Sequence, residues 1–347
     1  MGETINLPDD TGNNTANDTY WNNGLDCFIE LNQRKLALRA WIDSVDNPAD
    51  AREDKRIRQT INAELIKECL EKATSPPVLF LHGWLDNAGS FCELIEALQL
   101  QRKANPPMLA LDFAGQGRSD FREYSSPYTL YADMTDIINV LHTLDVSKVQ
   151  IVGHSRGAMV AWLFAALFPE RVDQCIFLDG MFPPPQSNRE AISVLRSAAQ
   201  PALASGRHLN VKSTRFSSYQ EALLARQNGR FPVTELVARA MAQRSLSETS
   251  EGWIWRNDIR LKLPHPYRLS KDQVLQIHEN FRVRSALLWS SDGLLVDRTN
   301  HCSLNNTVAS LCRKSDTLVC KVSGNHHAHM GSGLQQTLQY TQEFLSK

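Results

Sequence analysis

Short apolar runs that are followed by Gly, Asp, His or Ser recur along the chain, and segments of helical spacing lie between them. A run that is apolar on both faces is typical of a strand in a parallel sheet, because helices cover both sides of such a sheet. This alternation predicts a doubly wound α/β fold, with the chemistry at the carboxyl ends of the strands. The predicted strands are Val78–Leu81, Met108–Leu111, Val149–Val152, Cys175–Leu178, Ala286–Trp289 and Thr317–Val322, and the predicted helices are Phe91–Leu98, Leu130–Leu144, Ala158–Phe168 and Leu334–Leu345.

The segment before the first of these strands follows a different pattern. Residues 1–24 contain few apolar side chains and no periodicity, which predicts a disordered N-terminal arm. The segments Cys27–Leu31 and Lys35–Trp41 then predict a β-hairpin. Apolar residues spaced four apart between Asp46 and Lys72 predict a charge-rich helix. We interpret residues 46–74 as an insertion on the outside of the fold, with a solvated charged face.

Residues 181–281 interrupt the alternation of strands and helices. They open with three prolines, Pro183 to Pro185, and their apolar residues then follow helical spacing without a buried-strand run. We interpret this region as a helical cap inserted into the sheet domain. The predicted organisation is therefore an α/β core in two parts, residues 25–180 and 282–347, with the cap between them.

Composition and charge narrow the class of protein. The 347 residues include 37 basic and 38 acidic side chains, for a net charge of -1, whereas a dedicated nucleic-acid binder carries a basic face. Apolar runs fall well short of the roughly 20 residues that cross a bilayer, and the polar N-terminus does not read as a signal peptide. We therefore expect a cytoplasmic protein with neither a membrane span nor a nucleic-acid partner. The C-terminal Leu345-Ser346-Lys347 differs from the Ser-Lys-Leu peroxisomal address.

The seven cysteines are scattered and contain no CxxC pair. An odd, dispersed set favours reduced, buried thiols over disulfides or a zinc site. We expect neither a metal nor a cofactor.

The segment Gly153-His154-Ser155-Arg156-Gly157 has the G-x-S-x-G pattern of a nucleophile elbow. An apolar strand precedes it and a helical pattern follows it, and this context makes the signal strong. In such an elbow the serine occupies a strained turn, and the glycines let the backbone pass closely. The N-terminus of the following helix also supplies free N–H groups where an oxyanion would form. We therefore predict Ser155 as a nucleophile.

A serine nucleophile needs a general base, which this fold places near the end of the chain. The last histidine cluster is Gly324–His329, after the final predicted strand. We predict His326 as the base, because it comes first out of the turn. His327 and His329 are alternatives whose simpler interpretation is packing and hydrogen bonding in the loop.

The base needs an orienting acid, and three aspartates are candidates. Asp292 follows a predicted strand and precedes Gly293, so we rank it first. Asp179, which closes the strand after the elbow helix, is second, and Asp297 is third. Two of the three should be structural, since an aspartate after a strand is often a turn or helix cap.

The oxyanion hole needs a second backbone donor. The loop after the first strand of the core sheet contains Gly83, which allows a bend, and the amide of Trp84 can then pair with that of Arg156. For the Arg156 side chain we favour a salt bridge to the cap over attraction of an anionic substrate.

These segments resemble the α/β-hydrolase superfamily, and more narrowly the serine hydrolase-like (Kraken-type) proteins, which are relatives of epoxide hydrolases and haloalkane dehalogenases. The resemblance spans about residues 25–345 and implies Ser155 as nucleophile, His326 as base, and the amides of Trp84 and Arg156 as oxyanion donors. It leaves the acid open, because Trp289-Ser290-Ser291-Asp292 lacks the glycine of the usual Gly-x-x-Asp. The matching segments are LHGWLDNAGSF at 81–91, LDFAGQGRS at 111–119, GHSRG at 153–157, GNHHAHM at 324–330 and, in the cap, LPHPYRL at 263–269.

The resemblance also narrows the reaction. Epoxide hydrolases and dehalogenases use an aspartate at the elbow, whereas a serine forms acyl esters. We therefore predict a serine hydrolase that cleaves a carboxylic ester or related acyl bond of a small molecule, with the cap closing an apolar pocket over the acyl group. A second hypothesis is a ligand-binding or sensor protein that retains the fold but turns over negligibly. A third is a scaffold in which Asp46–Lys72 is a docking helix.

Overall fold

The computed structural model describes residues 24–31, 34–42, 60–101, 106–123, 125–203, 213–265, 268–297, 299 and 303–346. The predicted N-terminal arm, apart from Gly24, lies outside the described residues, as does the part of the predicted insertion before residue 60. In the part of the chain that is described, no helix is both long enough and apolar enough to cross a membrane.

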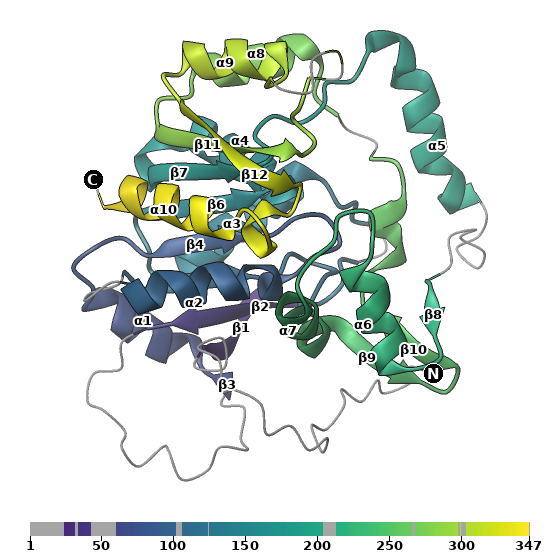
Figure 1. The fold of residues 1–347 in the computed structure, drawn as a ribbon. Coiled ribbons are helices and arrows are strands. Elements are labelled where there is room, and N and C mark those ends of the chain that lie inside the picture. Colours follow the sequence, from purple (N-terminus) through teal and green to yellow (C-terminus); the bar gives the residue numbers. More distant parts are fainter. Residues whose placement is uncertain are drawn as a thin grey trace.

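A nine-stranded sheet forms the centre of the molecule (Figure 1), with the strand order β12-β11-β7-β6-β4-β5-β2-β1-β3. Strands β4 to β7, β11 and β12 pair in parallel, and β2 is antiparallel to both β5 and β1. The predicted hairpin and the six predicted core strands are therefore confirmed. The strands are β1 (Leu25–Leu31), β2 (Arg34–Trp41), β3 (Thr60–Ile61), β4 (Val78–Leu81), β5 (Met108–Leu111), β6 (Val149–His154), β7 (Val172–Leu178), β11 (Arg284–Asp292) and β12 (Leu318–Asn325).

Both faces of the sheet are buried, which explains the uninterrupted apolar runs. In β4, Leu79 and Leu81 belong to one apolar cluster, and Val78 and Phe80 belong to another on the opposite face. Helices α3 and α4 contribute to the first cluster, and α2 and α10, on the near face in Figure 1, contribute to the second. The core helices are α1 (Ala63–Glu71), α2 (Cys92–Gln101), α3 (Leu130–Thr143), α4 (Arg156–Leu167), α9 (Asn306–Lys314) and α10 (Leu334–Leu345).

The described part of the predicted insertion is only partly helical. Thr60 and Ile61 form the short strand β3, which pairs with β1, and helix α1 begins at Ala63. The side chain of Asn62 accepts a hydrogen bond from the Leu65 amide at 2.9 Å, so this residue caps the helix and ends the strand. One side chain of α1, Ile66, is fully buried against the core. The four-residue spacing instead places Leu65 on the docking face, and that side chain is 42% exposed.

The region predicted as a cap contains more than helices. A three-stranded antiparallel sheet, in the order β8-β10-β9, accompanies its helices. The spacing of apolar residues does not predict these strands, because they are short and the residues of β10 are only half-buried. None of the three strands therefore has the apolar run that is typical of a buried strand. The elements are α5 (Ala191–Leu203), β8 (Arg215–Phe216), α6 (Tyr219–Gln227), α7 (Glu235–Ser245), β9 (Leu246–Thr249), β10 (Gly252–Trp255) and α8 (Lys271–Glu279).

Helix α8 packs on the core although its residues fall within the predicted cap. It lies beside α9 in Figure 1, away from α6 and α7, and its Val274 joins the same apolar cluster as α4. The Trp162 indole of α4 donates a hydrogen bond to His278 of α8 at 3.3 Å. The core therefore resumes before residue 282.

Candidate active site

The turn between β6 and α4 holds Ser155 in a strained backbone conformation. Its φ is 50° and its ψ is -110°, a region that residues other than glycine rarely adopt. A Cβ atom at Gly157 would lie 2.0 Å from the Leu81 carbonyl oxygen, so the elbow packs against β4 only with glycine there. These features are those of the elbow that the sequence predicts.

His326, which follows β12, contacts Asp179, which follows β7. The Nδ1 atom of His326 lies 2.5 Å from Oδ2 of Asp179, and both residues are buried. The Asp179 carboxylate also accepts hydrogen bonds from the backbone amides of Ser290, at 3.0 Å, and Leu294, at 2.8 Å. Since a carboxylate accepts, Nδ1 of His326 carries the proton and Nε2 carries the lone pair. This is the orientation that a general base for a serine requires.

The three candidate aspartates differ in whether they contact His326. Asp292, ranked first, is the last residue of β11, where its exposed carboxylate accepts a hydrogen bond from the Ser291 hydroxyl at 2.8 Å. Asp297, ranked third, accepts hydrogen bonds from the backbone amide and hydroxyl of Thr299. The second choice, Asp179, contacts His326. Strand order alone does not explain this, because β11, which ends at Asp292, lies directly beside β12, whereas β7 is one strand further away. The difference is that the Asp179 carboxylate is buried and held by two backbone amides, whereas that of Asp292 is exposed.

A buried histidine fixes one of the two peptides predicted to bind the oxyanion. His82 Nε2 accepts a hydrogen bond from the Phe113 amide at 3.0 Å, so its Nδ1 is protonated and donates to the Gly83 carbonyl oxygen at 2.7 Å. That carbonyl belongs to the same peptide as the Trp84 N–H. His82 therefore sets the direction of the amide that the sequence predicts as an oxyanion donor. The second predicted donor, the Arg156 amide, lies in the first turn of α4.

The Arg156 side chain forms a salt bridge, but its partner is not in the cap. Its guanidinium donates two hydrogen bonds, at 2.9 and 2.5 Å, to Oδ2 of Asp133 on core helix α3. Arg122 donates to the other oxygen of the same carboxylate at 3.1 Å. All three side chains are buried. The charge of Arg156 is thus balanced within the core.

Ser155 and His326 line one cavity of about 550 Å³, whose wall also contains residues of the region predicted as a cap. Its wall includes Trp84 from the core, whose indole donates a hydrogen bond to the Leu261 carbonyl oxygen at 3.1 Å. Cap elements supply much of the remaining lining, including Phe216, Arg226, Phe231, Trp255, Ile259 and Lys262. Most of the wall is apolar, with cationic side chains among the aromatic rings.

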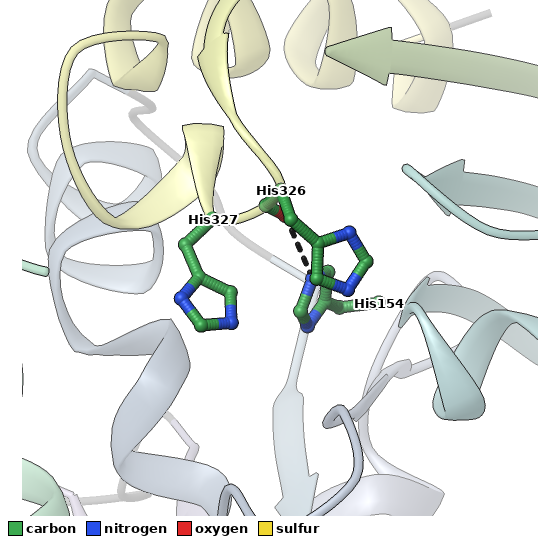
Figure 2. Close-up of side chains that lie close together, drawn as sticks. All are labelled: His154, His326 and His327. Carbon is green, nitrogen blue, oxygen red and sulfur yellow. Dashed lines mark hydrogen bonds between the residues drawn. The ribbon is translucent and has the colours of Figure 1, made fainter. Parts of the chain in front are cut away.

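Three further histidines surround His326. His327 and His329, the alternative bases, come from the same loop, and His154 is the residue before Ser155. Burial lowers the pKa of His327 to about 4 and that of His329 to about 3, and it also depresses the pKa of His154. His154 Nε2 donates a hydrogen bond to the His326 carbonyl oxygen at 3.0 Å (Figure 2). His154 was not among the residues predicted for the site, although the sequence has a histidine inside the elbow and three more near the end of the chain.

Comparisons with known proteins agree with this architecture. Residues 76–329 match the family model described as the alpha/beta hydrolase fold, and the chain belongs to this family. It is 26% identical over 256 residues to a serine hydrolase-like protein of Danio rerio, an alignment that covers 74% of this chain and 77% of that protein. A serine hydrolase-like protein of Mus musculus is 27% identical over 266 residues, which cover 74% of this chain and 84% of the relative. The predicted resemblance is thereby confirmed.

A solved structure supports the same assignment. The crystal structure of a hypothetical protein from Pseudomonas aeruginosa superposes with a TM-score of 0.75 and 26% identity, covering 93% of this chain and 100% of that one. A thioesterase domain from the curacin biosynthetic pathway superposes with a TM-score of 0.69 at 19% identity, over 91% of this chain and 98% of that domain. The second likeness shows the fold alone.

Proposed function

We propose that this protein is a serine hydrolase that cleaves a carboxylic ester or related acyl bond. Ser155 is the nucleophile, His326 the general base and Asp179 the acid that orients it. The observation that carries the proposal is the contact between His326 and Asp179, together with the cavity that His326 and Ser155 both line. The kinship with serine hydrolase-like proteins of zebrafish and mouse supports it.

The first half of the reaction forms the acyl-enzyme. His326 Nε2 takes the proton of the Ser155 hydroxyl while Oγ attacks the carbonyl carbon of the substrate. Asp179 holds the resulting imidazolium, and His326 then gives its proton to the leaving alcohol as the carbon–oxygen bond breaks. The backbone amides of Trp84 and Arg156 donate hydrogen bonds to the carbonyl oxygen and so stabilise the negative charge that forms on it.

The second half releases the acid. A water molecule loses a proton to His326 and attacks the acyl carbon, and the proton returns to Ser155 Oγ as the ester bond to the enzyme breaks. Residues of the cap exclude other water from the cavity and so strengthen the bonds to the oxyanion.

The cavity lining suggests the kind of substrate. Aromatic and aliphatic side chains suit an apolar acyl or alcohol group. Arg226 is already paired with Asp86 at 2.9 Å, whereas Arg230 and Lys262 are exposed at the rim of the cavity. An ester with an anionic group away from the scissile bond therefore suits this rim.

A fluorophosphonate probe, which reacts with activated serines, tests the proposal. The wild-type protein should be labelled, and Ser155→Ala should abolish labelling. Ser213 lines the same cavity, so Ser213→Ala is the matched control and should still be labelled. Labelling that persists in Ser155→Ala would refute the assignment.

The hypothesis of a ligand-binding protein without turnover ranks below hydrolysis. An acid too far from the base to orient it would favour such a protein, and the contact of Asp179 with His326 argues against it. Substrate turnover by the wild type above that of Ser155→Ala would exclude it.

A further inference from the structure

Three histidine side chains converge beside the strained serine. His154, His326 and His327 are buried, and each offers a ring nitrogen within 4.8 Å of those of the other two. Figure 2 shows the three rings gathered at one place, with His326 and His327 coming from the loop after β12 and His154 from the end of β6. Segments far apart in the sequence therefore build a single cluster.

In each ring, one nitrogen already donates a hydrogen bond. His154 Nε2 donates to the His326 carbonyl oxygen at 3.0 Å, and His327 Nδ1 donates to the Phe231 carbonyl oxygen at 3.1 Å. The Nδ1 atom of His326 donates to Asp179. Since carbonyl and carboxylate oxygens only accept, these three nitrogens carry the protons. The other nitrogen of each ring is then left with a lone pair, as in histidines whose second nitrogen is anchored for metal binding.

A carboxylate completes the group of acceptors. Oδ2 of Asp86 lies 3.7 Å from Nδ1 of His154 and 3.8 Å from Nε2 of His327. Among the residues that the structure describes, Nδ1 of His154 has no hydrogen-bond partner. A Cβ atom at Gly83 would approach Nδ1 of His154 to 2.8 Å and Oδ2 of Asp86 to 2.9 Å, so glycine there leaves room for both acceptors.

Several buried lone pairs that face one another without a donor are unfavourable, and a cation between them removes the cost. From this geometry we infer that His154, His326, His327 and Asp86 form a binding site for a divalent transition metal ion of the Zn²⁺ type. Imidazole nitrogens with one carboxylate oxygen are ligands that Zn²⁺ prefers, whereas Mg²⁺ and Ca²⁺ require mostly oxygen. In a tetrahedral zinc site neighbouring ligand atoms are about 3.3 Å apart, so the Asp86 contacts at 3.7 and 3.8 Å need a small contraction, and the histidine nitrogens, which lie within 4.8 Å of one another, need a contraction of at most about 1.5 Å.

The metal would act as an inhibitor, a consequence that rests on the proposed function. Because Nδ1 of His326 donates to Asp179, the nitrogen left to bind a metal is Nε2, the atom that takes the proton of Ser155 in the proposed reaction. A metal ion bound to that lone pair leaves no base for the serine. The scattered cysteines predict no metal site, and this one is built from histidines brought together by the fold.

Binding is tested first without catalysis. Ser155→Ala removes the proposed nucleophile and keeps all four ligands, so calorimetric titration of this variant with Zn²⁺ should show one ion bound per chain. Substituted Co²⁺ should give the visible absorption of a tetrahedral site. A titration without saturable binding would overturn the inference, whatever the catalytic activity.

Variants then locate the ion. In the Ser155→Ala background, His327→Gln should weaken Zn²⁺ binding at least about tenfold. His142→Gln, which changes an exposed histidine on α3, is the matched control and should not. Asp86→Asn, which keeps the shape of its side chain, should also weaken binding and serves if His327→Gln does not fold. Equal losses in the control and the cluster variants would contradict the site.

Inhibition is measured last, on the protein with Ser155 intact. Zn²⁺ should suppress ester hydrolysis by the wild type, and EDTA should restore it. His327→Gln, compared with its own metal-free rate, should need at least about tenfold more Zn²⁺ for the same suppression. Zn²⁺ binding without any hydrolysis would reject the proposed function but keep the metal site, whereas hydrolysis unaffected by Zn²⁺ would reject inhibition.

Discussion

His326 Nδ1 lies 2.5 Å from Asp179 Oδ2, although the two residues are 147 positions apart in the sequence. Two backbone amides, those of Ser290 and Leu294, hold the carboxylate in place. Three strands of the sheet thus meet at this carboxylate: Asp179 follows β7, Ser290 belongs to β11 and His326 follows β12. In the proposed reaction, a base whose orienting carboxylate is held by these fixed groups needs little reorganisation when the serine loses its proton.

The first prediction separates Asp179 from Asp292. Asp179→Asn should lower kcat by about 10³- to 10⁴-fold, because an amide favours the wrong tautomer of His326 and no longer stabilises the imidazolium. Asp292→Asn, the matched control, removes an exposed carboxylate and should leave kcat near the wild-type value. Steady-state hydrolysis of an activated ester measures both. A loss confined to Asp292→Asn would return the acid to the first-ranked candidate.

The contrast between these aspartates shows how far the sequence alone can predict the site. The elbow around Ser155 and the histidine loop are local patterns, and so are the strands that are buried on both faces. The acid is not local, because three aspartates follow strands in a similar way. Which of them contacts His326 depends on how the loops after β7, β11 and β12 meet, and no single segment encodes that arrangement.

Other differences between the predicted and the observed structure have a similar cause, because local sequence patterns do not encode contacts between distant segments. Strands β8 to β10 of the region predicted as a cap are short and partly exposed, and they lack an apolar run. The sequence pattern therefore does not predict them. Arg156 was expected to pair with the cap, but its partner Asp133 lies on α3, where helical spacing predicts only which face is apolar. The cluster of His154 and Asp86 likewise depends on how distant loops meet.

The second prediction concerns His82, which holds the Gly83 carbonyl oxygen. His82→Phe keeps a ring of similar size but removes both hydrogen bonds, so the Trp84 amide loses its fixed direction. Loss of one oxyanion donor costs about 10²- to 10³-fold in kcat, and we expect a fall toward that range with a smaller change in KM. The Phe113 amide, left without its partner, should also lower the free energy of unfolding by about 1–3 kcal/mol, while the Gly83 carbonyl oxygen keeps the Asp86 amide as a donor at 3.3 Å.

His278→Phe is the control for that loss of stability. His278 is also buried, accepts a hydrogen bond from the Trp162 indole and donates one to the Leu311 carbonyl oxygen, and does not line the cavity that contains Ser155. The His278→Phe variant should lose a similar free energy of unfolding, measured by urea unfolding, without the fall in kcat. Equal falls in kcat for both variants would mean that His82 acts only through stability.

The third prediction uses a buried ion network that joins β1 to the region predicted as a cap. Burial alone would raise the pKa of Asp26, but ion pairs with Arg244, Arg39 and Arg118 more than offset it and lower the pKa from 3.8 to about 2. Because this folded-state pKa lies below the ordinary value, the stabilisation is present above about pH 4 and is lost as the pH falls toward 2. Its size is about 2 kcal/mol.

Asp26→Asn tests this dependence on pH. The difference in unfolding free energy between the wild type and the variant should be largest near neutral pH and shrink as the pH falls from 4 to 2. Urea unfolding at several pH values measures it. The exposed Asp292→Asn is the control and should change stability by less than about 0.5 kcal/mol. A difference that does not vary with pH would contradict the low pKa of Asp26.

The fourth prediction tests the cationic rim of the cavity. Lys262→Glu should raise KM about two- to fivefold for an ester with a distal carboxylate and leave KM for a neutral ester of the same shape unchanged, because an exposed charge contributes only about 0.2–1 kcal/mol. The effect should fade in about 1 M salt, where the screening length is only about 3 Å. Lys271→Glu makes the same charge change at an exposed lysine of α8, which is outside the cavity lining, and controls for net charge. If both variants raise KM equally, the attraction comes from the charge of the whole protein, and the rim has no part in selecting the substrate.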